Sequence, residues 1–192
     1  MIKVIAFDYA EVVAEGPMSK WVREHLHQDQ EKLIAYRKHA HKWDVGEMEL
    51  TQVYKILGEF TEIKPEDIWG KFYEKSRLNT KVIKIIKNLK KEYKIILFSN
   101  FISELLLRLL KYHKIENLFD EIIVSSDYGL KKPDPKFFEI LVKKSGVKRS
   151  EIVFTDDKIN NVSDAILFGI KAYQFVSAEK LIQDLKAEGV KI

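Results

Sequence analysis

The sequence contains no cysteine, and it has only four prolines and eight glycines among its 192 residues. Without cysteine the chain forms no disulfides and no thiolate-ligated metal sites. No apolar run approaches the roughly 20 residues that a membrane-spanning helix needs. The N-terminus shows no basic segment followed by a long apolar run, which is the pattern of a secretory signal. These absences favour a cytoplasmic protein without a membrane partner.

Basic residues exceed acidic ones only slightly, and the net charge is +4. Most of the basic residues are lysines that alternate with acidic or apolar side chains, and no arginine-rich or aromatic-basic patch stands out. The charge pattern therefore gives no support to a nucleic-acid partner. A hydrophobic fraction of 46% and a charged fraction of 32% are typical of a globular protein with a full core.

The chain divides into two kinds of segment. Residues 15–79 hold all three tryptophans, and their apolar residues recur at helical spacing. The remainder, residues 1–14 and 80–192, alternates apolar β-branched runs with helical patterns. We predict an α/β protein, a doubly wound parallel sheet with a Rossmann-like core, and a small helical cap inserted after the first strand. The expected strands are 2–7, 94–98, 121–125, 152–156 and 170–173, and the expected core helices are 81–91, 102–110, 136–144 and 161–168.

Polar side chains follow several of these strands at the point where each strand ends. Asp8 ends the first strand, and Ser99 and Asn100 follow the second. Because the carboxyl ends of parallel strands converge on one crevice, we expect these side chains to meet there. Asp8 suits a nucleophile that forms an aspartyl-phosphate, and Ser99 suits a group that holds a phosphoryl oxygen. Taken alone, each could instead cap a helix.

A lysine and a pair of aspartates complete the predicted site. Lys132 stands before Pro133, in a rigid segment where it could neutralise charge on a phosphoryl group, although a surface lysine is the simpler alternative. Asp156 and Asp157 end a later strand. Crowded carboxylates repel each other, and a hard cation such as Mg²⁺ relieves the repulsion. A polar turn that caps the next helix is the alternative for this pair.

The order and spacing of these segments resemble the haloacid dehalogenase superfamily of hydrolases. The resemblance covers almost the whole chain and is strongest at residues 98–100, 125–135 and 152–169. It implies that Asp8 is the nucleophile and that Ser99 and Lys132 are catalytic. It also implies that Ser99, Asn100 and Lys132 bind the substrate. The implied Mg²⁺ ligands are the side chains of Asp8, Asp156 and Asp157 together with the backbone carbonyl of Ala10.

One position departs from the family pattern. Phosphatases of this superfamily usually carry a second aspartate, a general acid and base, two residues after the nucleophile, and here that residue is Ala10. General acid–base catalysis contributes roughly 10² to 10⁴ in rate. The loss should be greatest for alkyl phosphates and small for acyl or aryl phosphates. Glu11 is one position away, and we expect it to point elsewhere.

The sequence thus predicts an enzyme, a Mg²⁺-dependent phosphohydrolase that cleaves a small phosphorylated metabolite and is either a monomer or a homodimer. Two alternatives remain open: a 2-haloacid dehalogenase-type hydrolase, and a weakly active or non-catalytic binding member that has lost its acid at Ala10. The pair Asp156–Asp157 favours phosphate over the carbon–halogen bond. For the cap aromatics Trp21, Tyr36, Trp43 and Trp69, the sequence favours a place in the interior of the cap over contact with the substrate.

Overall fold

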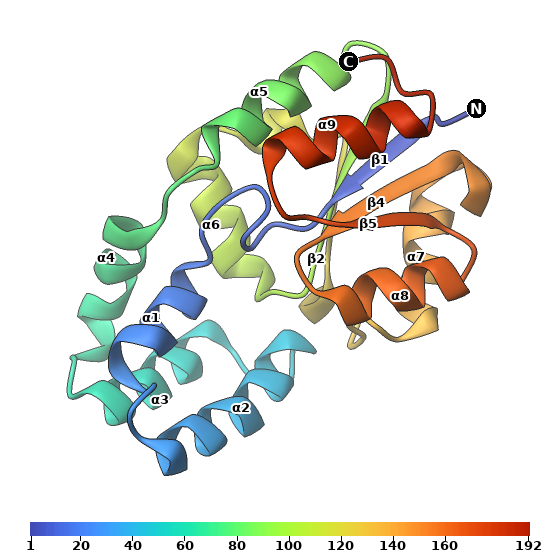
Figure 1. The fold of residues 1–192 in the computed structure, drawn as a ribbon. Helices are drawn as coiled ribbons and strands as arrows, with labels where there is room; N and C mark the ends of the chain where they lie inside the picture. Colours follow the sequence, from blue (N-terminus) through green and yellow to red (C-terminus); the bar gives the residue numbers. More distant parts are fainter.

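The computed structural model describes residues 1–192 and is built around one five-stranded sheet in which every pairing is parallel (Figure 1). The strand order is β3-β2-β1-β4-β5. The strands are β1 (Val4–Phe7), β2 (Lys94–Ser99), β3 (Glu121–Val124), β4 (Ile152–Asp156) and β5 (Lys171–Gln174). The predicted doubly wound sheet is therefore confirmed, with strand bounds within two residues of those expected.

The central strand β1 is buried on both faces, and all four of its residues are apolar. Ile5 and Phe7 belong to one hydrophobic cluster, whereas Val4 and Ala6 belong to a second cluster on the opposite face. This alternation follows from the two-residue period of a strand. A continuous apolar run such as this one is what a parallel sheet covered on both faces requires.

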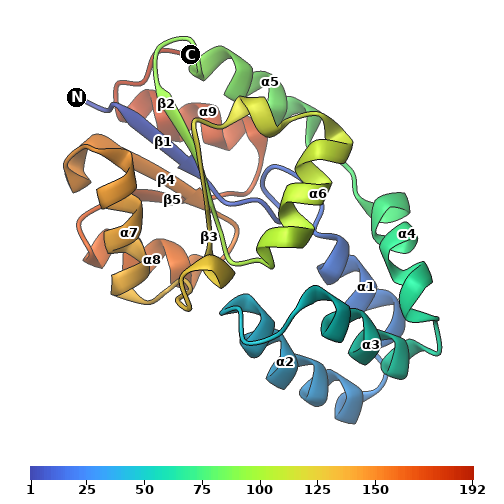
Figure 2. The same ribbon diagram turned by 180° about the vertical axis from the view of Figure 1, so that it is seen from behind.

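Helices cover the two faces of the sheet, as Figures 1 and 2 show. One face carries α5 (Thr80–Leu89), α6 (Ser103–His113) and α9 (Ala178–Ala187), and the other carries α7 (Pro135–Ser145) and α8 (Ile159–Leu167). Short 3-10 turns lie at Glu116–Leu118, Ser125–Asp127 and Arg149–Glu151. The sequence reasoning did not include α9. No helix combines the length and the apolar character that crossing a bilayer would demand.

Four further helices form a separate group beyond the carboxyl ends of the strands (Figure 1). They are α1 (Pro17–His25), α2 (Gln30–Asp44), α3 (Leu50–Thr61) and α4 (Pro65–Lys75), and together they are called the cap below. Trp21 is fully buried inside the cap, where its ring meets Phe72 edge-on at 5.5 Å.

Two crossings of the chain join the cap to the core, and they run side by side. The amide of Glu15 donates to the carbonyl of Arg77 at 2.8 Å, and the amide of Asn79 donates to the carbonyl of Val13 at 2.9 Å. Residues 13–15 and 77–79 are called the hinge below. The hinge holds the cap above the strand ends that carry the polar side chains.

Candidate active site

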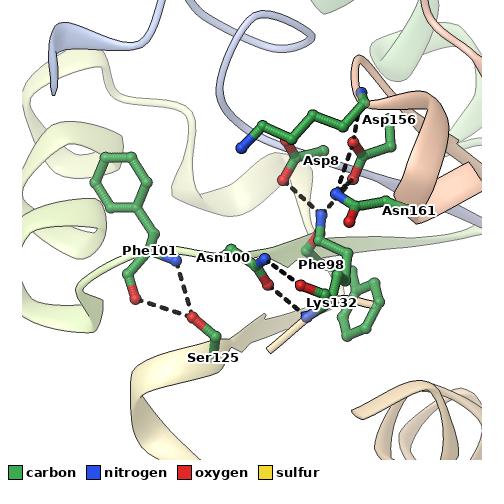
Figure 3. Close-up of polar contacts among 9 residues, drawn as sticks. Asp8, Phe98, Asn100, Phe101, Ser125, Lys132, Asp156 and Asn161 are labelled. Atoms are coloured by element: carbon green, nitrogen blue, oxygen red, sulfur yellow. Dashed lines mark hydrogen bonds and ion pairs between the residues drawn. The ribbon is translucent and has the colours of Figure 1, made fainter. Parts of the chain in front are cut away.

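Asp8 lies at the carboxyl end of the central strand. Phe7 is aligned with Leu97 of β2 and Thr155 of β4, so the next residue leaves the sheet between two neighbouring strands. The amide of Asp8 donates to the carbonyl of Thr155 at 2.9 Å, which continues the strand pairing by one step. Asp8 is only 6% exposed, and its carboxylate points toward the ammonium of Lys132 (Figure 3).

Lys132 contacts two of the predicted carboxylates at once. Its Nζ donates to Asp8 Oδ1 at 2.8 Å and to Asp156 Oδ2 at 2.6 Å (Figure 3). A third bond from the same ammonium reaches the carbonyl of Phe98 at 2.9 Å. Lys132 is 2% exposed and Asp156 is fully buried, so these charges are solvated by one another rather than by water.

The backbone of Lys132 is held by the side chain of Asn100. The Asn100 amide nitrogen donates to the Lys132 carbonyl at 2.9 Å, and the Asn100 carbonyl oxygen accepts from the Lys132 amide at 2.8 Å. Both polar atoms of the Asn100 side chain are therefore engaged, as Figure 3 shows. This geometry lets Asn100 position Lys132, and its predicted contact with the substrate stays a prediction.

Asp156 is fixed by the beginning of α8. Its Oδ1 accepts from the Lys158 amide at 2.8 Å, and both of its oxygens lie 3.0 Å from Asn161 Nδ2. Sequence reasoning gave Asn161 no role. The available signal was an amide side chain five residues after a strand-end aspartate, in the first turn of the next helix.

Asp157 joins Asp8 and Asp156 in a cluster whose nearest carboxylate oxygens all lie within 4.8 Å of one another. Burial, together with the negative charges of Asp8 and Asp156, raises the pKa of Asp157 to about 6. Three carboxylates and the single ammonium of Lys132 leave a formal charge of −2 in the site. Hard oxygen ligands with two uncompensated negative charges fit a divalent cation such as Mg²⁺.

The pKa values of Asp8, Asp156 and Lys132 are shifted as well. Burial raises the pKa of Asp8 even though Lys132 opposes the change. Burial would also raise the pKa of Asp156, but Lys132 and the hydrogen bonds from the Lys158 amide and Asn161 together lower the pKa below its ordinary value. Burial alone would lower the pKa of Lys132, and the two aspartates instead raise it. Lys132 is therefore a fixed positive charge and not a proton donor near neutral pH.

Ser99 and Ala10 lie at the same edge of the sheet. The Ser99 hydroxyl is buried and has no hydrogen bond of good geometry to any protein group, and the N-cap of the following helix is Ile102 rather than Ser99. Such an orphan hydroxyl near Asp8 is available for a ligand oxygen. Ala10 offers no acidic side chain.

The neighbouring Glu11 does not fill the place of the missing acid. Its Oε1 accepts from the Gly16 amide at 3.3 Å and lies 4.0 Å from Arg23 Nη1. These contacts commit its carboxylate to the beginning of α1. Glu11 therefore does not supply the missing proton donor in this structure.

The model of the haloacid dehalogenase-like hydrolases matches residues 2–169, which is most of the chain. The chain belongs to this family. The matched residues include all four segments that carry the site residues, and the observed fold is the one that the resemblance predicted. The predicted hydrolase family is thereby confirmed.

Several curated proteins are similar to the chain in sequence. It is 26% identical over 133 residues to the sesquiterpene phosphatase astK of Aspergillus oryzae. The aligned region covers 67% of this chain and 68% of that protein. It is 24% identical over 198 residues to the D-ribitol-5-phosphate phosphatase of Bacteroides thetaiotaomicron, covering 91% and 92%. The match to the drimenol cyclase drtB of Aspergillus calidoustus is 25% identical, and the chain spans only 31% of that protein's length.

Solved structures share the fold at low sequence identity. A HAD family enzyme of Bacteroides thetaiotaomicron, in complex with magnesium and inorganic phosphate, has a TM-score of 0.72 at 19% identity, covering 91% of this chain and 94% of that one. L-2-haloacid dehalogenase of Xanthobacter autotrophicus has a TM-score of 0.68 at 16% identity, covering 100% and 85%. Because both chemistries share the fold, the choice between them depends on the side chains of the site.

Proposed function

We propose that the protein is a Mg²⁺-dependent phosphohydrolase that cleaves a small phosphate monoester through an aspartyl-phosphate on Asp8. The observation that carries the proposal is the contact of one buried ammonium, Lys132, with Asp8 and Asp156, next to a third carboxylate, Asp157. A dehalogenase needs the nucleophile and the lysine, but it needs no metal ion and therefore no cluster of three carboxylates.

The proposed reaction has two displacements at phosphorus. A carboxylate oxygen of Asp8 forms a bond to phosphorus while the bond to the leaving-group oxygen breaks. Water then attacks the same phosphorus, the bond to Asp8 breaks, and inorganic phosphate and free Asp8 result. The intermediate divides one difficult hydrolysis into two easier steps.

The surrounding groups stabilise the charge on the transferred phosphoryl group. Lys132 contributes a fixed ammonium that requires no rearrangement during the reaction. The unpartnered hydroxyl of Ser99 donates a hydrogen bond to a phosphoryl oxygen. Asn100 keeps Lys132 in register through the pair of bonds to its backbone.

The side chains of Asp8, Asp156 and Asp157, with the backbone carbonyl of Ala10, would hold Mg²⁺. When bound, the cation neutralises the repulsion between the anionic phosphate and the anionic nucleophile. Asp156 has less freedom than Asp157, because Lys132 and Asn161 already occupy both of its oxygens. Asp157 is accordingly the better candidate for direct ligation.

Hydrolysis of p-nitrophenyl phosphate tests this function. We expect release of nitrophenol with Mg²⁺, loss of activity with EDTA and recovery with excess Mg²⁺. Asp8→Asn serves as the control for contaminating phosphatases. Metal-independent release of chloride from 2-chloropropionate, without phosphatase activity, would identify a dehalogenase, and inactivity on both substrates would favour a binding protein.

A further inference from the structure

A cavity of about 230 Å³ lies between the cap and the carboxyl edge of the sheet. Its core side is lined by Ala10, Asn100 and Lys158. Each of these three lies within two positions, along the chain, of a proposed catalytic or metal-binding residue. An alcohol group esterified to a phosphate on Asp8 would therefore extend into this cavity.

The walls of the cavity are mostly apolar. Eight of its twelve lining residues are hydrophobic, and the aromatic ones are Tyr36, Trp43 and Phe101. The rings of Tyr36 and Trp43 meet edge to face, with centroids 5.4 Å apart and planes inclined at 66°. Flat apolar groups pack favourably against such rings. The sequence reasoning assigned both residues to the interior of the cap; Trp43 is indeed buried in the hydrophobic core with Tyr36 packed against that core, and both also border the cavity.

Two of the polar groups in the cavity are already paired with protein groups. Asn100 uses both ends of its amide on Lys132, and Asp44 pairs with Lys131 at 3.2 Å. The hydroxyls of Ser19 and Tyr36, the indole N–H of Trp43 and the ammonium of Lys158 remain. Burying a hydroxyl against the apolar walls without a hydrogen-bond partner is unfavourable. A sugar or another polyol would bury several, so the lining disfavours such a leaving group.

The residue at position 10 constrains the leaving group in a second, independent way. Ala10 contributes a methyl group to the cavity wall and no proton, so the leaving group departs without protonation from this position. A phenol resembles the tyrosine side chain, which has a pKa of about 10, and its anion is therefore a far better leaving group than an alkoxide. Apolar walls and the absent acid favour the same kind of alcohol.

We infer that the substrate is an aryl phosphate monoester, whose small aromatic ring occupies the cavity between Tyr36, Trp43 and Ala10. This inference rests on the proposed phosphohydrolase function and adds the chemical class of the leaving group. The modest volume of the cavity, below the range of roughly 300–1,000 Å³ that is usual for drug-sized ligands, suits one ring or a fused pair.

The test compares four phosphates with the wild-type enzyme and Mg²⁺. Phenyl phosphate has the ring and the good leaving group, and cyclohexyl phosphate has similar size but a poor leaving group. Glucose 6-phosphate is a polyol, and acetyl phosphate needs neither apolar walls nor an acid. We expect phenyl and cyclohexyl phosphate to have KM values at least tenfold below that of glucose 6-phosphate, and phenyl phosphate to have the higher kcat of the two.

A variant that fills the cavity provides the second test. Ala40 lines the cavity on α2, and Ala40→Trp should raise the KM for phenyl phosphate at least tenfold relative to the KM for acetyl phosphate. Lys38→Trp, at an exposed position of the same helix, adds the same indole outside the cavity and should leave the ratio unchanged. The wild-type substrate comparison does not depend on whether either variant folds.

The outcomes separate the two proposals. Hydrolysis of acetyl phosphate with equal or better kcat/KM for glucose 6-phosphate than for phenyl phosphate would overturn the aryl assignment and leave the phosphohydrolase intact. Failure to hydrolyse any of the four would overturn the phosphohydrolase function, and the aryl assignment with it.

Discussion

At the scale of single residues, the ammonium of Lys132 has the most demanding environment. Breaking a buried ion pair by removing one partner costs about 3–5 kcal/mol, because the remaining charges stay buried without compensation. Lys132→Met should lower the free energy of unfolding by about that amount and abolish turnover. Urea denaturation measures the change.

The adjacent lysine is a matched control. Lys131 also pairs with an aspartate, Asp44, but both side chains are 25% exposed. Pairs in contact with water contribute about 0–1 kcal/mol. Lys131→Met should therefore change the unfolding free energy by less than about 1 kcal/mol. Equal losses of unfolding free energy in the two variants would contradict the conclusion that the buried ion pairs of Lys132 stabilise the fold more than the exposed pair of Lys131.

Asp8→Asn tests the nucleophile. The amide retains an oxygen that can accept from Lys132, so we expect a folded protein with an unchanged circular dichroism spectrum. Turnover of p-nitrophenyl phosphate should fall below detection, since an amide oxygen is a poor nucleophile towards phosphorus. Retained turnover would show that another residue attacks.

Ala10→Asp tests the missing acid. A carboxyl group at this position should protonate alkoxide leaving groups and raise kcat for an alkyl phosphate by up to about 10²-fold, the lower end of the range for general acid catalysis. Aryl and acyl phosphates should gain much less. Ala10→Asn has nearly the same shape without the proton and should give no gain. Equal gains for all substrates would refute the explanation.

At the scale of elements, the hinge region contains a titratable contact between the cap and the core. Ser76 directly follows α4 and is 2% exposed, and its hydroxyl lies 2.7 Å from Nε2 of His113 at the end of α6. Burial, with a smaller contribution from Arg77, lowers the pKa of His113 from its ordinary value of 6.5. The folded protein therefore favours a neutral imidazole at this contact.

The depressed pKa has a consequence for stability against pH. Below pH 6.5 the unfolded chain binds a proton at His113 more readily than the folded protein does. Stability is thus complete above pH 6.5 and declines as the pH falls through the lower, folded pKa. His113→Gln should reduce this decline, measured as the urea midpoint between pH 5 and 7.5, while His27→Gln at an exposed position should not. A decline as steep as that of the wild type would remove His113 from the explanation.

At the scale of the whole molecule, the acidic cluster predicts that Mg²⁺ stabilises the fold. A ligand at 100 times its Kd that binds only the folded state contributes about 2.7 kcal/mol. For a protein of this size that corresponds to a rise in Tm of about 5–10 °C. Asp157→Asn should remove most of the rise in a thermal-shift experiment. An equal rise in this variant would place the cation elsewhere.

The sequence was sufficient for the sheet and for the gathering of Asp8, Lys132, Asp156 and Asp157. Apolar β-branched runs identify the strands, and parallel pairing brings their ends together regardless of distance along the chain. The helix α9 was missed although its signal was present. Ser177 caps it, and Ala178, Leu181 and Leu185 recur at helical spacing on its buried face. Omitting it left one face of the sheet incompletely covered.

Other features depend on how separate elements meet, and sequence spacing does not contain that information. Helical periodicity predicts that Trp43 and Tyr36 face inward, but it does not distinguish the inside of the cap from the cavity wall. The choice depends on how the hinge orients α2 against the sheet. The hydrogen bonds that Asn161 and Asn100 make likewise join residues whose proximity exists only in the fold.

Because the two crossings of the hinge lie side by side, the cap begins and ends at nearly the same point. A different helical module can therefore be grafted there by joining two adjacent ends, without disturbing the order of the strands. Exchange of the cap at that single junction would give the same site residues a new range of substrates. The architecture separates the evolution of selectivity from the evolution of chemistry.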